Sequence, residues 1–279
     1  MRVAALFVAS TGVTVAVAAS ANVPVLRVAA PNGQLSLMIA SLHVPVDGLL
    51  EPASSIFDGA RHYAVEHEDP DLPPRAVITE WSTSLSEREV DTYLQRTSCI
   101  GLSEAAARRQ LHEPTPHVAN IYAYIICPLP LEPSRDSYIS NIAPPALVKH
   151  PDVLEDANWV EMQRRKVPAS ADLSGFRWTL SHDPRVVLEA IRDALNAGDY
   201  DSVREQTLDS LGSPAAAMAF GKHMVDERNA KWLPKLRALF DDGHAVVIVG
   251  AMHFPGPTGL IAILRREGYT VDAVGWPAR

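Results

Sequence analysis

The segment from residue 245 to residue 274 constrains the fold more than any other part of the chain. In HAVVIVGAMHFPGPTGLIAILRREGYTVDAV, an apolar run at 245–249 stops at Gly250, and a turn containing His253 follows. The remainder has the pattern of a helix, stopped at Gly268, and a further strand. A strand, helix and strand in succession form a βαβ-like unit, which requires a sheet covered by helices. The predicted fold class is therefore α/β (α+β), with a mixed central sheet flanked by helices.

A second stretch, LSLMIASLHVPVDGLL, repeats part of this arrangement near the N-terminus. Each copy has an apolar strand, a small residue (Ala40 or Gly250), a histidine three positions later (His43 or His253), and then a proline. Immediately upstream, VLRVAAPNGQLSLMIASLH predicts a hairpin that turns at residues 31–33. We therefore expect a sheet built from two related halves. Both histidines would stand at strand ends, where ligands of open α/β sheets gather.

The chain divides into three parts by composition. Residues 1–21 combine one arginine, an apolar run and small residues before Asn22, which predicts a signal peptide and a periplasmic or extracellular protein. A buried N-terminal strand or helix is the alternative. Residues 22–279 form a single predicted domain, which contains an irregular, proline-rich and divergent insert at about 112–168. Capping residues predict a helix in SEREVDTYLQRT, opened by Ser86 and Glu89, and one in DPRVVLEAIRDALNAGD, from Asp183 to Gly198. Two more helices are predicted around SPAAAMAFGKHM and DERNAKWLPKLRALFDDG. No segment after the leader is long and apolar enough to span a membrane stably.

Several classes of function are excluded by charge and motif. A net charge of −8 without a dense Lys/Arg cluster argues against a nucleic-acid partner. The chain has no Gly-x-Ser-x-Gly elbow, phosphate-binding P-loop or dinucleotide fingerprint, so ordinary serine hydrolases and nucleotide enzymes are not indicated. The two cysteines, Cys99 and Cys127, could form a disulfide in an oxidising compartment or remain two buried thiols, and the sequence leaves both possibilities open.

Three residues at predicted strand ends have the chemistry of a metal site. His43 and His253 end two apolar strands, and Glu66 ends a short strand in RHYAVEHE. Two imidazoles and a carboxylate are a familiar ligand set for a catalytic divalent metal ion. A single histidine at a strand end is also compatible with a purely structural, hydrogen-bonded role.

The same residues carry a resemblance to a known family. The stretches ERNAKWLPKLRALFDDGHAVVIVGAMHFPGPTGLIAILRREGYTVDAV and ASLHVPVDGLLEPASSIFDGARHYAVEHE resemble the TraB/GumN family, which includes the Tiki metalloproteases. The resemblance implies a site made of His43, His253, Glu66 and the pair Arg228-Asn229. In this site Arg228 could hold a carboxylate, either that of the substrate or the side chain of Glu66. An acidic residue that many relatives carry in a Leu-Glu step is not found near KVPASADL. The family is also similar in architecture, more distantly, to erythromycin-esterase and ChaN-like haem-binding proteins.

Two functions follow from this resemblance. The first is an exported metal-dependent hydrolase acting on a peptide or small-molecule substrate: His43 and His253 hold a divalent metal ion, Glu66 is catalytic, Arg228 steadies the anionic intermediate, and Asn229 binds substrate. The second is a non-catalytic binding or regulatory protein that sequesters a peptide or a haem-like ligand. Ala40, in place of the family's glycine, and the divergent middle region favour the second function.

Overall fold

The computed structural model describes residues 22–67, 81–113 and 116–279. The predicted leader and Glu68, a candidate second carboxylate, lie outside these residues. The predicted hairpin is confirmed: β1 (Asn22–Ala29) pairs antiparallel with β2 (Leu35–Ser41). Gly33 takes the positive φ of 88° that its turn requires.

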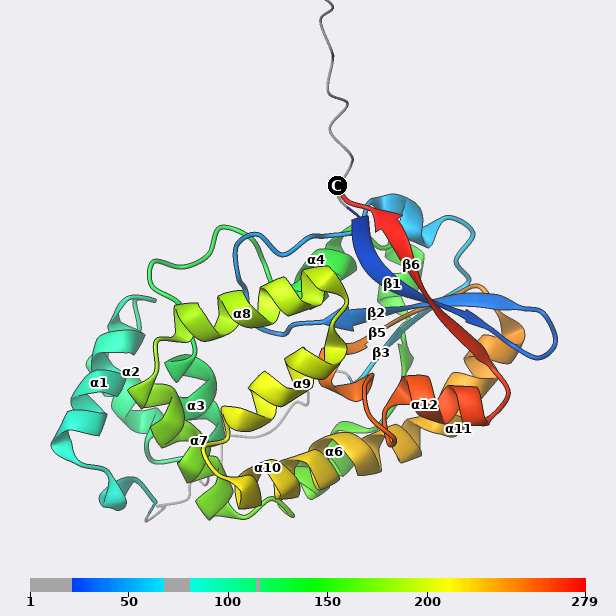
Figure 1. Cartoon of the computed structure of the whole chain (residues 1–279). Helices are drawn as coiled ribbons and strands as arrows, with labels where there is room; N and C mark the ends of the chain where they lie inside the picture. The colour runs from blue at the N-terminus through cyan, green and yellow to red at the C-terminus, as the bar shows by residue number, and fades with distance from the viewer. Residues whose placement is uncertain (1–21, 68–80, 114–115) are drawn as a thin grey trace, which may run out of the picture.

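Over these residues the strands form one mixed sheet in the order β4-β3-β5-β2-β1-β6 (Figure 1). The remaining strands are β3 (His62–Val65), β4 (Asp152–Val153), β5 (Ala245–Gly250) and β6 (Thr270–Pro277). Strands β4, β3, β5 and β2 are mutually parallel, whereas β1 is antiparallel to both of its neighbours. The carboxyl ends of four parallel strands therefore meet at one edge of the sheet.

Strands β2 and β5, which precede His43 and His253, are adjacent in the sheet. Their pairing is offset by one residue from the alignment of the two sequence copies, in which Ala40 corresponds to Gly250. Ala40 lies opposite Val249, and Ser41 lies opposite Gly250. Ala40 is buried, and its side chain lies on the face of the sheet that packs against the helices between residues 184 and 266. Alanine is therefore accommodated where the family's first motif has glycine, because this position is not the spatial counterpart of Gly250.

Helices cover both faces of the sheet and supply its core. One face packs against α8 (Pro184–Ala197), α9 (Tyr200–Asp209), α11 (Glu227–Asp242) and α12 (Leu260–Arg266). The opposite face packs against η1 (Ser54–Phe57), α4 (Arg135–Ile142) and α5 (Pro145–Lys149). The predicted start and stop of α8 are confirmed, with Asp183 as the N-cap and Gly198 as a left-handed C-cap.

A lobe of helices adjoins the sheet (Figure 1). Its core around Tyr93 and Phe176 is formed by η2 (Trp81–Ser84), α1 (Glu87–Ser98), α2 (Glu104–Gln110), α3 (His117–Ala123) and α7 (Ala169–Ser181). Ser86 and Glu89 form the predicted capping box of α1. A disulfide between Cys99 and Cys127, with their Cα atoms 6.1 Å apart, ties the end of α1 to the chain after α3.

Residues 112–168, the predicted proline-rich insert, form short elements joined by loops. This segment contains α3, α4, α5, β4 and α6 (Ala157–Arg164), so its prolines separate short elements instead of preventing them. The two helices predicted on either side of residue 224 are also one continuous helical rod. In it α10 (Pro214–Phe220) passes through a π-helical turn, η3 (Gly221–Asp226), directly into α11. Such turns are frequent at functional sites.

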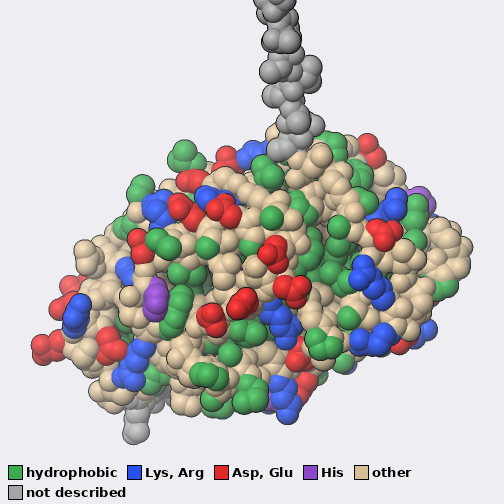
Figure 2. Space-filling model, viewed as in Figure 1, with side chains coloured by type: hydrophobic (Ala, Val, Ile, Leu, Met, Phe, Trp, Pro, Cys, Tyr) green, Lys and Arg blue, Asp and Glu red, His purple; other side chains and the backbone are tan. Residues whose placement is uncertain are grey.

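No helix within the described residues is long and apolar enough to cross a membrane. On the face seen in Figure 2, acidic, basic and apolar side chains are interspersed, in agreement with the absence of a dense basic cluster from the sequence.

Candidate active site at the carboxyl edge of the sheet

Four polar side chains lie at the shared carboxyl edge of the parallel strands. His43 lies two residues beyond β2, Glu66 follows β3, Glu155 lies two residues beyond β4, and His253 ends the short turn η4 (Ala251–His253) after β5. Gly250, the last residue of β5, is the common neighbour of three of them. A methyl group placed on its α-carbon would lie 3.0 Å from His43 Nε2, 3.2 Å from Glu66 Oε1 and 3.6 Å from His253 Cδ2. The sequence-predicted residues therefore converge on one point.

The Glu66 carboxylate is held ionised by its surroundings. Its Oε2 accepts a hydrogen bond from Arg228 at 2.6 Å, and its Oε1 accepts one from the Gly250 amide, also at 2.6 Å. Burial alone would raise its pKa, but the charges of Arg228 and His43 and the bond from Gly250 outweigh burial and hold the pKa well below its usual range. Glu66 is thus a carboxylate at neutral pH.

The ring of His253 is neutral, and Asn229 decides its tautomer. The Asn229 amide donates to the carbonyl oxygens of His253 and Thr258, at 3.1 and 2.9 Å, so its Oδ1 is free to accept. That oxygen lies 2.7 Å from His253 Nδ1, which must therefore carry the proton. Burial, together with the charges of Arg228 and His43, lowers the pKa of His253 from 6.5 to about 3. The Nε2 lone pair is consequently available at neutral pH.

His43 has the same arrangement with a charged partner. Its Nδ1 lies 3.0 Å from Asp136 Oδ2, which also accepts a 2.5 Å hydrogen bond from the hydroxyl of Ser41. Its Nε2 is 3.8 Å from Glu66 Oε1. Burial would lower the pKa of His43, but Asp136 and Glu66 raise it to about 9. The side chain of His43 is 62% exposed, so it is the accessible member of the site.

Arg228 holds the carboxylate of Glu66, one of the two partners expected for it, and Asn229 is hydrogen-bonded within the protein. The Arg228 guanidinium donates to Glu66, to Glu155 and to the Met224 carbonyl oxygen, so each of its nitrogens already has a partner within the protein. Asn229 is fully buried and uses its whole amide on the chain. Arg228 therefore orients the carboxylate of Glu66, and Asn229 orients the ring of His253.

Glu155 is a buried carboxylate of the site that the sequence analysis did not predict. The Leu-Glu step is present as Leu154-Glu155, upstream of the KVPASADL segment in which it was sought. The side chain of Glu155 is fully buried, its Oε1 accepts from Arg228 Nε at 2.7 Å, and burial raises its pKa. The dipeptide was the signal that could have found it. Asp136, the other unpredicted residue, lies in the proline-rich segment with no local signal.

The donor set suits a divalent metal ion in chemistry. Both histidines have Nδ1 tied to an oxygen, which leaves Nε2 as the coordinating atom. The Nε2 lone pair of His253 is available at neutral pH, whereas His43, with a pKa of about 9, must lose its Nε2 proton to bind a cation. Gly250 leaves open the space that a Cβ would fill. Among residues 22–67, 81–113 and 116–279, however, no group of three His, Cys, Asp or Glu side chains is arranged to hold a metal ion. The residues that fit the role by chemistry are His43, His253 and Glu66.

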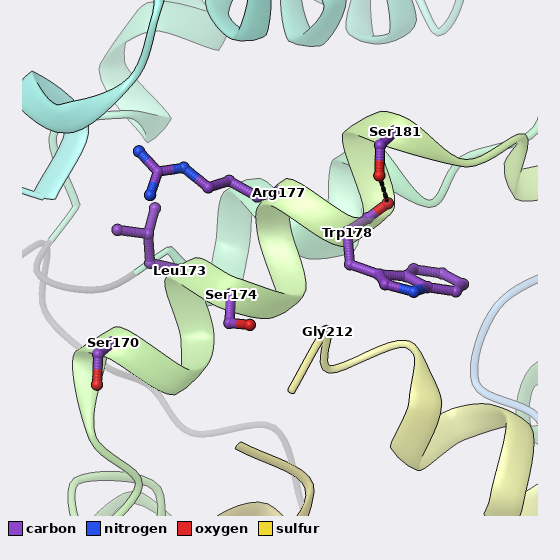
Figure 3. Close-up of a pocket in the computed structure, with 7 residues that line it drawn as sticks. All are labelled: Ser170, Leu173, Ser174, Arg177, Trp178, Ser181 and Gly212. Carbon is purple, nitrogen blue, oxygen red and sulfur yellow. Dashed lines mark hydrogen bonds between the residues drawn. The ribbon is translucent and has the colours of Figure 1, made fainter. Parts of the chain in front are cut away.

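A cavity of about 450 Å³ lies elsewhere, against α7 (Figure 3). One wall is formed by side chains of α7, several of them serines, and Gly212 lies opposite. The lining residues are Ser170, Leu173, Ser174, Arg177, Trp178, Ser181 and Gly212. No acid, imidazole or thiol lines this cavity, so it lacks the groups for acid–base or metal chemistry. The carboxyl edge of the sheet is the candidate active site.

Comparison with known proteins agrees with this location. Residues 153–273 match the model of the TraB/PrgY/gumN family, whereas no curated protein and no solved structure gives a significant match. The matched segment includes Glu155, Arg228, Asn229, Gly250 and His253, and the resemblance predicted from the sequence is confirmed. The comparison therefore supports assignment to the TraB/PrgY/gumN family over residues 153–273.

Proposed function

We propose that this protein is a metal-dependent hydrolase, in which His43 and His253 hold a divalent cation and Glu66 completes the shell or accepts a proton from water. The observation that carries the proposal is the convergence of two imidazole rings, each with its Nδ1 tied, and an ionised carboxylate over Gly250. A bound divalent cation supplies a water whose pKa is lowered towards neutrality and polarises the bond to be broken. The chain then needs no serine or cysteine nucleophile.

The residues of the chain contribute three functions to such a reaction. Glu66 is ionised at neutral pH, which suits a ligand of the cation, and Arg228 fixes its orientation; its lowered pKa makes it a weaker proton acceptor than an ordinary carboxylate. His253 is neutral and buried, which suits a ligand whose orientation does not change. His43 is exposed at the mouth of the site, so it is the residue placed to meet substrate, and its ring is held by Asp136.

We propose a peptide as the substrate and the exterior of the cytoplasm as the location. The first rests on the resemblance of the two motifs to the Tiki metalloproteases, and the second on the signal-peptide pattern of residues 1–21. Mass spectrometry of protein from its native host tests the second directly, because the mature chain should begin near Ala19 or Asn22. An intact Met1 on most molecules would refute export.

The central experiment combines metal analysis with cleavage. Protein purified without chelators is examined by elemental analysis and then incubated with a peptide library, with and without chelator. Glu66→Gln should abolish cleavage and leave the fold intact, whereas His43→Ala and His253→Ala should remove the metal as well. Asp91→Asn, an exposed substitution on α1, is the matched control and should behave as the wild type.

Two outcomes would overturn the proposal in different ways. Cleavage that chelators do not affect would indicate metal-free chemistry of the erythromycin-esterase type, with histidine and glutamate acting as acid and base. Absence of cleavage with every divalent metal, combined with retention of a bound peptide or haem-like ligand, would indicate the non-catalytic binding protein.

A further inference from the structure

We propose that Asp136 is the positioning residue of His43: it fixes the ring so that Nε2 faces the space above Gly250, and so makes His43 competent as a metal ligand. This inference rests on the proposed function for the identity of the ligand that His43 binds. It does not depend on that function for the orientation of the ring, which is measurable without a metal.

The contact itself has one chemical interpretation. Asp136 Oδ2 lies 3.0 Å from His43 Nδ1 and 2.5 Å from the hydroxyl oxygen of Ser41, and a carboxylate can only accept from both. His43 Nδ1 therefore carries a proton, and the ring presents Nε2 to Glu66 and to the space over Gly250. Ser41 is the last residue of β2, so the carboxylate joins the strand end to the histidine two residues later.

The helix turn that carries Asp136 is anchored to the sheet by buried hydrogen bonds of Arg135. Arg135 is 1% exposed and donates to the carbonyl oxygens of Ala40 and Leu50 and to the carboxylate of Glu51. These bonds join the first turn of α4 to the end of β2 and to the loop that follows His43. Asp136 is thereby fixed relative to the same backbone that carries His43, which a mobile surface residue would not be.

The second histidine offers an internal comparison. Asn229 on α11 accepts from His253 Nδ1 at 2.7 Å, as Asp136 on α4 accepts from His43 Nδ1. Each ring is thus oriented through its Nδ1 atom, by acceptors on helices that cover opposite faces of the sheet. The buried ring has a neutral partner and the exposed ring has a charged one. A charged acceptor is suited to an exposed imidazole, because a neutral bond there competes poorly with water.

An ordinary surface ion pair is the competing explanation. The side chains of His43 and Asp136 are 62% and 35% exposed, and pairs this exposed contribute little to the free energy of unfolding. The two explanations therefore separate cleanly. Removal of a surface pair should change neither the free energy of unfolding nor the metal affinity by much. Removal of a positioning residue should leave the free energy of unfolding nearly unchanged but weaken metal binding by His43 and alter the protonation of its ring.

The experiment compares Asp136→Ala, Asp136→Asn and the control Asp91→Asn. Zn²⁺ binding to chelator-treated protein is measured by calorimetry, and the ring nitrogens of His43 are observed by ¹H–¹⁵N NMR without metal, above the pKa of about 9. Asp136→Ala should weaken Zn²⁺ binding about 10–100-fold, the usual effect of losing such a partner, and should shift the proton distribution between Nδ1 and Nε2. Asp136→Asn keeps an acceptor oxygen and should restore part of the affinity.

The two readouts distinguish failure of this inference from failure of the proposed function. Wild-type Zn²⁺ affinity and an unchanged His43 spectrum in Asp136→Ala would overturn the positioning role. If the wild type itself binds no divalent metal, the proposed function fails, and the NMR comparison alone then decides the role of Asp136. Thermal unfolding of each variant identifies an effect caused by loss of the fold, and Asp136→Asn, the more conservative change, then carries the comparison.

Discussion

Replacement of Gly250 by alanine is the most direct test of where the chemistry occurs. The backbone of Gly250 has φ −54° and ψ 138°, a conformation that alanine adopts without strain. The only obstacle to a side chain is therefore the space above the α-carbon. That space is bounded by His43 Nε2 at 3.0 Å and Glu66 Oε1 at 3.2 Å from the added methyl group.

The effect on stability should be modest. Ordinary contacts of a methyl group begin near 3.4 Å, so both neighbours must move by a few tenths of an ångström. His43 is exposed and can move, whereas Glu66 is fixed by Arg228 and by the amide of residue 250 itself. Overpacking costs about 1–3 kcal/mol, and the lower entropy of the unfolded chain with alanine offsets about 0.4–1 kcal/mol. We expect a net loss of about 1–2 kcal/mol.

The effect on function should be much larger, because the methyl group occupies the point on which the three groups converge. Displacement of reacting groups by about 1 Å can cost on the order of 100-fold in rate, so we expect at least that loss in cleavage. Gly221→Ala is the matched control: its new methyl group would have no neighbour nearer than 3.8 Å. The assays are denaturant unfolding, Zn²⁺ calorimetry and peptide cleavage. A folded Gly250→Ala protein with wild-type affinity and rate would refute a reaction centre above this residue.

Three further predictions follow from the charges and the covalent link. Arg228→Met leaves the carboxylates of Glu66 and Glu155 buried without their cation, so the free energy of unfolding should fall by about 3–5 kcal/mol in denaturant titrations, and a change below about 1 kcal/mol would contradict a buried network. The pKa of His253 falls from 6.5 to about 3 on folding, so between these pH values the unfolded chain binds more protons than the folded chain. The free energy of unfolding should therefore decrease as the pH falls below 6.5. In unfolding curves measured across that range, His253→Asn should flatten this dependence. Cys99→Ser opens a disulfide across a sequence separation of 28 and should lower stability by about 3 kcal/mol, whereas an unfolding midpoint equal to that of the wild type, and equally insensitive to reductant, would show that the bond does not form.

The sequence predicted those residues of the candidate site that lie next to a recognisable local pattern. His43, Glu66 and His253 each follow a short apolar strand, and the pattern of an apolar run ended by a turn identifies such positions without a structure. Family resemblance identified the Arg228-Asn229 pair and gave Arg228 two possible carboxylate partners, of which the structure shows Glu66. Solvent exposure and hydrogen-bond partners decide whether an arginine holds a substrate or a neighbouring glutamate, and neither quantity is local in sequence.

Asp136 and Glu155 were missed for a related reason. Both lie in the proline-rich segment, where helices are too short to show a clear periodic pattern. Their importance comes from packing: α4 lies against the sheet and brings Asp136 to His43, and the two-residue strand β4 pairs with β3 and brings Glu155 to Arg228. A strand of that length has no sequence signature of its own, since its stability comes from the neighbour with which it pairs.

The sequence by itself determined the fold class, the hairpin of β1 and β2, the capped helices α1 and α8, and the strand ends that carry the histidines. These features depend on backbone geometry and on hydrophobic periodicity over a few neighbouring residues. The tertiary structure alone decided the one-residue offset between β2 and β5, the protonation of the two histidines, and the partners of Arg228. Strand pairing, burial and charge proximity join residues far apart in the chain, and their free energies exist only after the chain has folded.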